Sequence, residues 1–356
     1  MSAVIMLALS LSAPYIACCR SDERGQMRKL LVLILVLAAL WSGYWFVGAT
    51  AVERGAQAVL DNLHAQGWQV EVADVGTRGF PNRFDTTATG VKLADPLGGF
   101  AWTAPFFQVL ALSYKPNHVI AALPDSQSFD FPGQTLQVDS TRMRASLVVE
   151  PGTALALDRA TFVAETANVT STLGWAIALK DARFATRQNG EALVHDVGIA
   201  ASKIALPKAL RDTYDPGGAL PEVLEVLRVD ATLGFDRAID RHAFNGGPAP
   251  QVERFVLNDA ALVWGGVKIA ATGTLTIGAD RLPVGDITLE SAQWRDVARM
   301  IADSGMIQPQ YVPTLDALFQ SMAAADGTPE VLTAPLTFKN GLVSFGFLPL
   351  GPAPRF

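Results

Sequence analysis

The residue types that most often carry chemistry are sparse in this chain and do not fall in catalytic spacings. Its four histidines, His64, His118, His195 and His242, form no HExxH pair, so the sequence does not indicate a zinc-protease site. It also holds no G-x-S-x-G nucleophile elbow, no phosphate-binding glycine loop and no calcium loop. We therefore expect no enzymatic activity, no bound metal and no cofactor. A hydrolase would require His118, His195 or His242 to gather with carboxylates in one cleft.

Two arginines lie in a compact motif, RGFPNRF, at residues 78–84. Guanidinium groups bind phosphates and carboxylates through two parallel hydrogen bonds, so Arg78 and Arg83 are the candidate contacts for a lipid phosphate or a protein partner. The structural alternative is a tight turn at the glycine and proline of the motif. In that case Phe80 and Phe84 insert into the core.

Tryptophans are spread through the chain and have two interpretations. They are core anchors, or some of them line a ligand groove, because concave apolar sites favour aromatic walls. The residues concerned are Trp68, Trp102, Trp175, Trp264 and Trp294.

Hydrophobic and polar residues alternate with a period of two over much of the chain. The clearest case is residues 227–236, LRVDATLGFD, and similar alternation occurs at 68–72, 142–149, 286–290 and 343–347. Such alternation is typical of antiparallel strands with one dry face and one wet face. Asn340-Gly341, between two β-like segments, predicts a hairpin turn.

These patterns predict a mainly β, β-rich α+β fold with large antiparallel sheets. The alternation does not distinguish a sandwich from a barrel-like closure or a curved groove. Residues 294–301 and 315–322 repeat at helical spacing and predict a late helical hairpin, interrupted near 305–309. Residues 207–221 either divide two β lobes or form a surface loop. The proline-rich tail, 348–356, is expected to finish the sheet at its edge, or else to act as a docking peptide.

An uncharged apolar segment near the N-terminus, Leu30–Val47, predicts a membrane span. Its 18 residues reach roughly 27 Å as a helix, close to the thickness of a bilayer's hydrocarbon core. Arg28 and Lys29 precede it, and aromatic residues cluster at its far end, where they favour the membrane interface. We predict a retained transmembrane signal anchor at 27–49, with cleavage near Gly48 as the alternative.

The basic residues before the span, Arg20, Arg24, Arg28 and Lys29, predict a cytoplasmic N-terminus. In a bacterium this corresponds to a single-pass inner-membrane protein with most of its chain in the periplasm. Residues 50–66 are expected to form a stalk or cover helix, and 67–356 a periplasmic β-rich domain.

The first 26 residues do not fit this plan, because a second apolar segment there ends at Cys18 and Cys19. We interpret residues 1–26 as a mis-annotated extension and Met27 as the start, with a lipoprotein signal as the alternative. Both cysteines of the chain lie in this leader, so the exported domain cannot depend on disulfides.

The charge balance argues against one class of partner. The formal net charge is −6 and no basic stripe is present, so nucleic-acid binding is not expected. The inner membrane is the expected partner, lipid is a candidate ligand, and protein partners are left open.

Three segments resemble one protein family. Residues 77–96, residues 340–356 and the Trp102-Ala104-Pro105 cluster are similar to the DUF2125 proteins of alphaproteobacteria, over Met27 to Phe356. The resemblance implies a compartment and a lineage but no activity. The plan of one anchor and a long β-rich body also resembles AsmA-like envelope proteins, in architecture alone.

Two function classes therefore lead. The first is a membrane-anchored protein that binds or transfers lipid or another hydrophobic ligand, since a one-sided apolar sheet must be covered by a second sheet or by a ligand. The second is an envelope assembly or scaffold protein that acts through protein contacts. An envelope hydrolase with an unrecognised site is the third.

Overall fold

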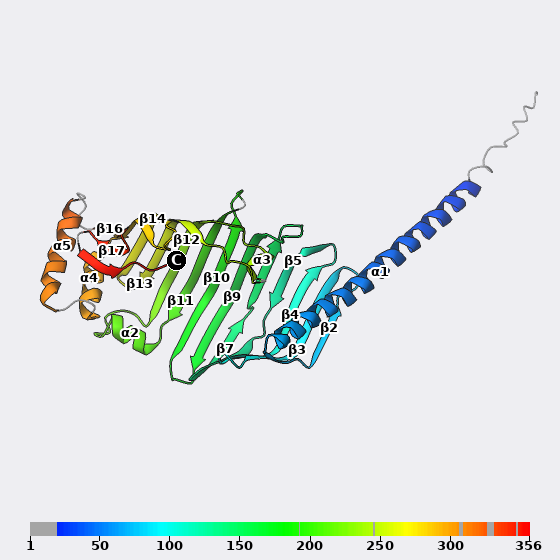
Figure 1. Ribbon diagram of the computed structural model, residues 1–356, viewed down its shortest axis with the longest axis horizontal. Helices are drawn as coiled ribbons and strands as arrows, with labels where there is room; N and C mark the ends of the chain where they lie inside the picture. The colour runs from blue at the N-terminus through cyan, green and yellow to red at the C-terminus, as the bar shows by residue number, and fades with distance from the viewer. Residues whose placement is uncertain (1–19, 192, 245, 306–308, 326–330, 347) are drawn as a thin grey trace, which may run out of the picture.

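The computed structural model describes residues 20–356 except 192, 245, 306–308, 326–330 and 347. A long N-terminal helix leads into an antiparallel sheet of 18 strands, with a late pair of helices at its far end (Figure 1). This confirms the β-rich α+β fold with one N-terminal apolar helix. Residues 1–19 of the predicted leader, including Cys18 and Cys19, lie outside the described residues, as does the centre of the predicted interruption near 305–309.

Helix α1 (Arg20–Ala65) is continuous through the predicted anchor and the predicted stalk. Among the described residues it is the one helix long and apolar enough to cross a membrane. It ends because Gly67 adopts a φ of +93° and the Trp68 N–H donates to the Leu63 carbonyl at 3.1 Å, which satisfies a carbonyl of the last turn.

The strands form one sheet in which every pairing is antiparallel. Their bounds are β1 (Gln69–Glu71), β2 (Asp74–Arg78), β3 (Arg83–Asp95), β4 (Phe100–Leu112), β5 (Lys115–Ala122), β6 (Ser126–Phe131), β7 (Gln134–Thr141), β8 (Arg144–Val149), β9 (Leu157–Ser171), β10 (Ala176–Gln188), β11 (Val194–Ala205), β12 (Val223–Phe235), β13 (Val252–Trp264), β14 (Val267–Ile277), β15 (Pro283–Ser291), β16 (Leu332–Lys339), β17 (Leu342–Phe345) and β18 (Leu348–Pro352).

From β9 to β18 the sheet is a meander in which each strand pairs with the next one in the chain. Near the N-terminus two short strands share one position at three places. β1 and β2 both pair with β3, β5 and β6 both pair with β4, and β7 and β8 both pair with β9.

Local turn chemistry ends the sheet as expected. Asn340 and Gly341 have φ values of 55° and 73° and connect β16 to β17, which confirms the predicted hairpin. The proline-rich β18 pairs with β17 at the end of the meander, so the tail does finish the sheet at its edge.

The remaining helices are α2 (Lys208–Tyr214), α3 (Arg241–Phe244), α4 (Trp294–Asp303), η1 (Pro309–Tyr311) and α5 (Val312–Ala325). α4 and α5 are the predicted late helices, and they bury an apolar cluster with β16 that includes Trp294, Phe319 and Leu332. β11 and β12 pair directly beside residues 207–221, where Ile204 lies opposite Leu224, so the sheet is continuous there. The division of the domain into two β lobes at residues 207–221 therefore stays a prediction.

Candidate functional site

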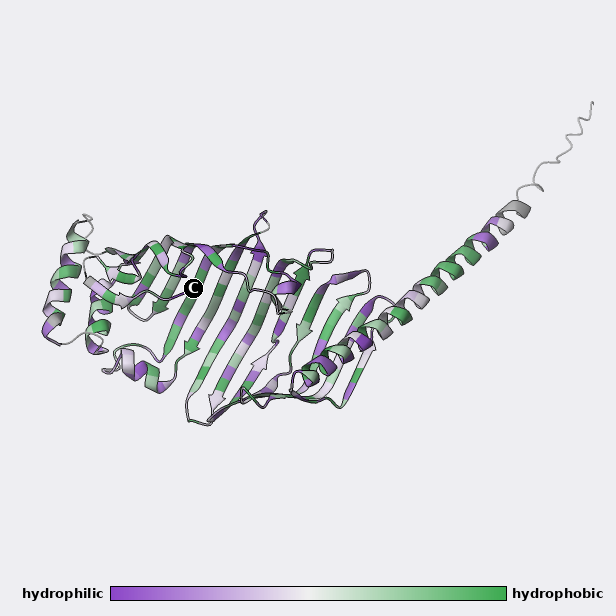
Figure 2. Ribbon diagram, viewed as in Figure 1, coloured by the Kyte–Doolittle hydropathy of each residue, from purple (hydrophilic) through white to green (hydrophobic). Residues whose placement is uncertain are grey.

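One face of the sheet is apolar across nearly its whole width. Residues paired across neighbouring strands lie on the same face, so a face can be followed from strand to strand. One row crosses nine strands through Phe84, Ala111, Val119, Leu147, Ala160, Thr186, Val197, Ala231 and Leu257. Thr186 is its one polar member. Figure 2 shows the corresponding alternation of hydrophobic and hydrophilic residues along the strands.

The opposite face is polar and carries ion pairs between neighbouring strands. Arg142 lies 2.8 Å from Glu165, and Arg228 pairs with Asp259. These side chains are largely exposed, so each pair contributes little to stability. These charged side chains keep the polar face of the sheet in contact with water. The apolar face is therefore the inner face.

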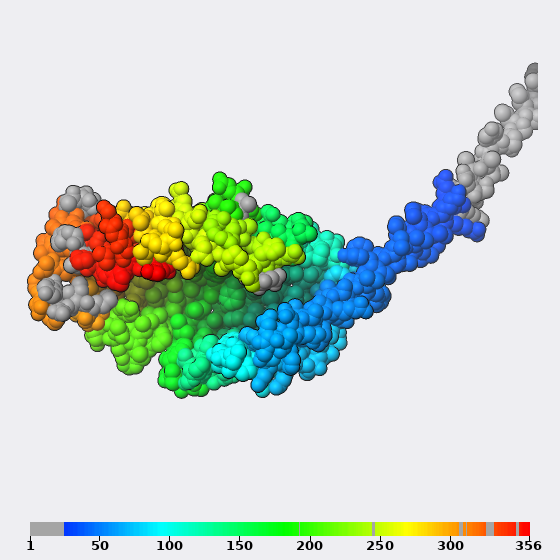
Figure 3. Space-filling view, viewed as in Figure 1, coloured from blue at the N-terminus to red at the C-terminus, as the bar shows by residue number. Residues whose placement is uncertain are grey.

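The sheet curves around its apolar face and leaves that face open. We call the inner face of β3–β16 the trough, and Figure 3 shows the molecule hollowed between its two long rims. On the floor of the trough Leu147, Phe184 and Ile199 keep 41, 39 and 42% of their surface exposed. In a β-sandwich a second sheet packs about 10 Å away and buries such side chains. The structure is therefore a curved groove rather than a closed sandwich.

A cavity of about 570 Å³ occupies the middle of the trough. Its floor includes Leu147, Phe184 and Val197, and its roof includes Leu155 and Ile239.

Two segments, 154–157 and 239–241, form the roof of this middle cavity, and we call them the strap. The Leu157 N–H donates to the Ile239 carbonyl at 2.8 Å, and the Arg241 N–H donates to the Ala154 carbonyl at 3.1 Å. Residues from both segments line the cavity together with the floor strands. The strap therefore covers the middle of the groove from one rim.

A second apolar cavity, of about 510 Å³, lies where α4 and α5 cover the far end of the trough. Met300, Leu315 and Phe319 of the helices face Leu289 and Leu336 of the sheet across it. The trough is thus covered at this end by helices, but the space beneath them is not filled.

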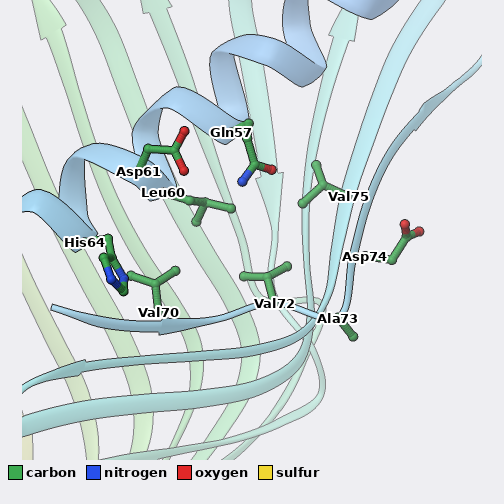
Figure 4. A pocket seen from close by; sticks show the side chains of 9 residues that line it. All are labelled: Gln57, Leu60, Asp61, His64, Val70, Val72, Ala73, Asp74 and Val75. Carbon is green, nitrogen blue, oxygen red and sulfur yellow. The ribbon is translucent and has the colours of Figure 1, made fainter.

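A third cavity, of about 430 Å³, has a different character. It lies between the end of α1 and the start of the sheet and is lined by Gln57, Leu60, Asp61 and His64 of the helix and by residues 70–75 (Figure 4). Its exposed walls are mostly polar, although three valines of residues 70–75 also line it. We regard it as a crevice under the helix rather than as part of the trough.

The near end of the trough is covered by α1, which docks on the RGFPNRF motif. The Trp45 Nε1 donates to the Arg83 carbonyl at 2.7 Å, and the Trp45 ring packs edge-on against Phe80 and close to Phe84. Gly48 is needed at this contact, because a Cβ there would lie 2.6 Å from the Phe84 ring. Phe84 is buried as expected, whereas Phe80 is not in the core. It is 52% exposed and stacks on Phe46 of α1.

The two candidate arginines of this motif lie at strand ends beside that contact. Arg83 opens β3, and its Nε lies 3.0 Å from Asp85, so the guanidinium is already paired on the polar face. Arg78 closes β2 and is exposed. The structure therefore separates the two roles: Arg83 holds a neighbouring carboxylate, while Arg78 is open to an outside group.

The histidines are dispersed. His118 lies 3.0 Å from Ser146 by its Nε2, and His242 is exposed on α3. His195 is buried against Phe235 at the start of β11, where burial lowers its pKa despite the opposing carboxylates of Asp196 and Asp158. Among the described residues, no three histidine, cysteine, aspartate or glutamate side chains are grouped to hold a metal ion.

The tryptophans divide between the two predicted roles. Trp264 and Trp294 are buried core residues in the part of the sheet near α4. Trp102 lies on the trough face and stacks on Phe129, with its Nε1 donating to Gln127 at 2.8 Å. It is half-buried and lines the groove near α1.

Sequence reasoning missed the docking of α1 on the motif. The aromatic cluster of α1 predicts an interface with lipid headgroups, and its contact with a loop some 40 residues later leaves no separate signal. The acceptors are main-chain carbonyls, which every residue supplies. By contrast, the period-two alternation does identify Leu147 and its row.

Comparison with known proteins gives one match. No curated protein and no solved structure matches the chain. The family model described as "Uncharacterized protein conserved in bacteria (DUF2125)" matches residues 45–354, which include the docking motif, the trough, α4 and α5, and α1 from Trp45 onward. The chain belongs to the DUF2125 family.

Proposed function

We propose that this is a non-enzymatic, membrane-anchored protein whose trough binds or transfers lipid or another hydrophobic ligand in the cell envelope. The observation that carries the proposal is the open apolar floor formed by Leu147, Phe184 and Ile199. Large contiguous apolar surfaces are rare on soluble monomers and commonly mark a binding site. An acyl chain covering this floor gains about 0.8 kcal/mol for each methylene group that leaves water.

The length of the trough supports a chain-like ligand. Eleven strand-to-strand steps separate β3 from β16, because β5 and β6 share one position and β7 and β8 share the next. At about 4.8 Å a step the trough is roughly 50 Å long. The hydrocarbon core of a whole bilayer is about 30 Å thick. The trough is therefore long enough to hold more than one acyl chain end to end.

The proposed placement in the envelope rests on α1. We propose that Leu30–Val47 spans the inner membrane once, with Arg28 and Lys29 on the cytoplasmic side and the sheet in the periplasm. The exposed apolar surface of α1 supports a span, since the side chains from Leu30 to Leu37 contact little else in the molecule. The family is described as bacterial, which supports an envelope with these compartments.

The test is lipid content in a matched pair of variants. Ile199 faces the trough, and Ala200, next in the same strand, faces away and lies between Arg183 and Arg228 on the polar face. Ile199→Glu puts a carboxylate on the apolar floor, whereas Ala200→Glu gains two cationic neighbours. Full-length proteins are purified from membranes in mild detergent without delipidation and measured by native and denaturing mass spectrometry.

We expect wild type and Ala200→Glu to carry a stoichiometric hydrophobic molecule and Ile199→Glu to lose it. Equal retention by both variants would place the ligand outside the trough. A folded wild-type protein without any ligand would favour the alternative, an envelope assembly or scaffold protein acting through protein contacts.

A further inference from the structure

We propose that two turns of the β domain dip into the membrane leaflet beside α1, so that the trough opens among acyl chains rather than in water. The turns are residues 79–82, between β2 and β3, and residues 112–115, between β4 and β5. The proposal rests on the anchoring part of the proposed function and does not depend on which ligand the trough holds.

The first argument is how α1 holds these turns. The Trp41 Nε1 donates to the Pro81 carbonyl at 2.9 Å, and the Tyr44 hydroxyl donates to the Ser113 carbonyl at 2.6 Å. Both donors lie inside the apolar segment Leu30–Val47. The turns are therefore fixed to residues that the membrane span itself requires.

The second argument is length. A span needs about 20 apolar residues, so the segment that begins at Leu30 is immersed to its end near Val47. Trp41 lies 11 residues after Leu30, or roughly 17 Å along the helix, about 10 Å short of the far edge of the hydrocarbon core. The turn bonded to Trp41 must then lie within the outer part of that leaflet.

The third argument is that several main-chain groups of the turns already have hydrogen-bond partners. In lipid, each unpaired N–H or carbonyl costs several kcal/mol. The Arg83 N–H donates to the Gly79 carbonyl and the Ser113 N–H to the Asn82 carbonyl, both at 2.9 Å. Trp41 and Tyr44 supply donors to two more carbonyls, as described above. In water these carbonyls would need no such partners.

The exposed side chains of the turns also fit the interface. Phe80 is 52% exposed and Tyr114 is 57% exposed, and aromatic rings are favoured at the boundary between headgroups and acyl chains. Arg78 and Lys115 flank the turns and are exposed, which places two cations where lipid phosphates lie.

An apolar path connects the turns to the trough. Phe84 follows the first turn directly and lies opposite Ala111, which lies opposite Val119, which lies opposite Leu147. Leu147 forms part of the floor of the middle cavity. An acyl chain that leaves the membrane between the two turns thus meets apolar side chains without crossing water.

The experiment measures the depth of single spin labels in proteoliposomes of phosphatidylethanolamine and phosphatidylglycerol. Full-length protein with Cys18→Ser and Cys19→Ser carries one new cysteine, Phe80→Cys or Tyr114→Cys. Leu97→Cys is the matched control, since Leu97 is exposed at the opposite end of β3 from the first turn. Leu35→Cys, in the middle of the apolar segment, reports whether α1 is in the membrane.

We expect labels at Phe80, Tyr114 and Leu35 to collide several-fold more with oxygen than with a water-soluble nickel complex, and the label at Leu97 to do the reverse. If the label at Leu35 reports lipid while the labels at Phe80 and Tyr114 report water, as at Leu97, then α1 is anchored in the membrane but the turns are not immersed, and the proposal is wrong. If Leu35 also reads water, the anchoring itself is wrong. Phe80→Cys and Tyr114→Cys test the proposal independently. If one of these variants fails to fold, the other still gives the result.

Discussion

The trough has a helical cover at each end, and the two covers are attached by different forces. α4 and α5 bury a continuous apolar cluster against β16, including Leu315, Phe319 and Ala334. α1 instead uses hydrogen bonds from aromatic side chains to main-chain carbonyls, together with the close approach of Gly48 to Phe84.

The surroundings of each cover explain this difference. In water, burying apolar surface is the main favourable term, so α4 and α5 need little else. On the proposed placement α1 leaves lipid, which is as apolar as its own side chains, so burial there gives little driving force. Hydrogen bonds and close packing then have to hold the helix. The four tests below either break this contrast or sharpen it.

The largest effect is expected at the apolar cover. Phe319→Ala removes a buried ring from the cluster under α5 and should cost about 3–5 kcal/mol of the free energy of unfolding. Urea titration of the purified full-length protein measures it. Phe356→Ala, at a partly exposed ring in the C-terminal tail, is the control and should cost well under half as much.

The hydrogen-bonded cover should respond to the loss of one donor. Trp45→Phe leaves the Arg83 carbonyl without its partner in a buried contact and should cost about 1–3 kcal/mol. Trp41→Phe removes a comparable bond that the protein leaves exposed but the proposed membrane covers, so in micelles it should cost about as much. Denaturant unfolding in detergent micelles compares the two. A clearly smaller loss for Trp41→Phe would mean that water rather than lipid surrounds the first turn.

Close packing at the same contact can be isolated with two glycines of α1. Gly48→Ala places a methyl group against the Phe84 ring, whereas a Cβ at Gly43 meets nothing within 4 Å. Both changes raise the helix propensity of α1 by a similar amount, so the difference in stability between the two variants reports the contact with Phe84 alone. We expect Gly48→Ala to be less stable than Gly43→Ala by about 1–3 kcal/mol. Hydrogen exchange at the N-terminal part of β3 gives the readout. Indistinguishable exchange would contradict a tight α1–β3 contact.

The smallest effect concerns the middle of the trough, which neither cover reaches. Burial lowers the pKa of His195 below its ordinary value near 6.5, so below that pH the unfolded chain binds a proton that the folded chain does not. The free energy of unfolding therefore has its full value above about pH 6.5 and decreases as the pH falls. Unfolding free energies at pH 7.5, 6.5 and 5.5 should fall in that order for wild type and fall less for His195→Asn. A slope in His195→Asn equal to the wild-type slope would show that another group carries the pH dependence.

The local elements were predictable because their causes are local. The alternation at 227–235 reports a dry face and a wet face directly, and Asn340-Gly341 encodes its own turn. What covers the dry face is not encoded there, because a second sheet and a ligand require the same alternation. The cover over the middle of the groove includes pairings such as Ala154 with Arg241, whose main-chain groups carry no side-chain signal.

The candidate site was predictable only in part for the same reason. Arg78 and Arg83 drew attention through their charge, yet the groups of the motif that bind α1 are the carbonyls of Pro81 and Arg83. Phe80 was expected in the core since it is apolar. It is exposed because α1 brings Phe46 to it from outside the sheet. Such a contact between distant segments cannot be derived from either segment alone.

The strap has a consequence for traffic through the proposed groove. Its two main-chain hydrogen bonds, from Leu157 to Ile239 and from Arg241 to Ala154, join segments at the same rim, because one segment leads into β9 and the other follows β12. The strap therefore reaches over the floor from one side only. A long ligand in the proposed groove would be held from above near Leu147 and Phe184, so its middle would be fixed in place while its two ends could exchange.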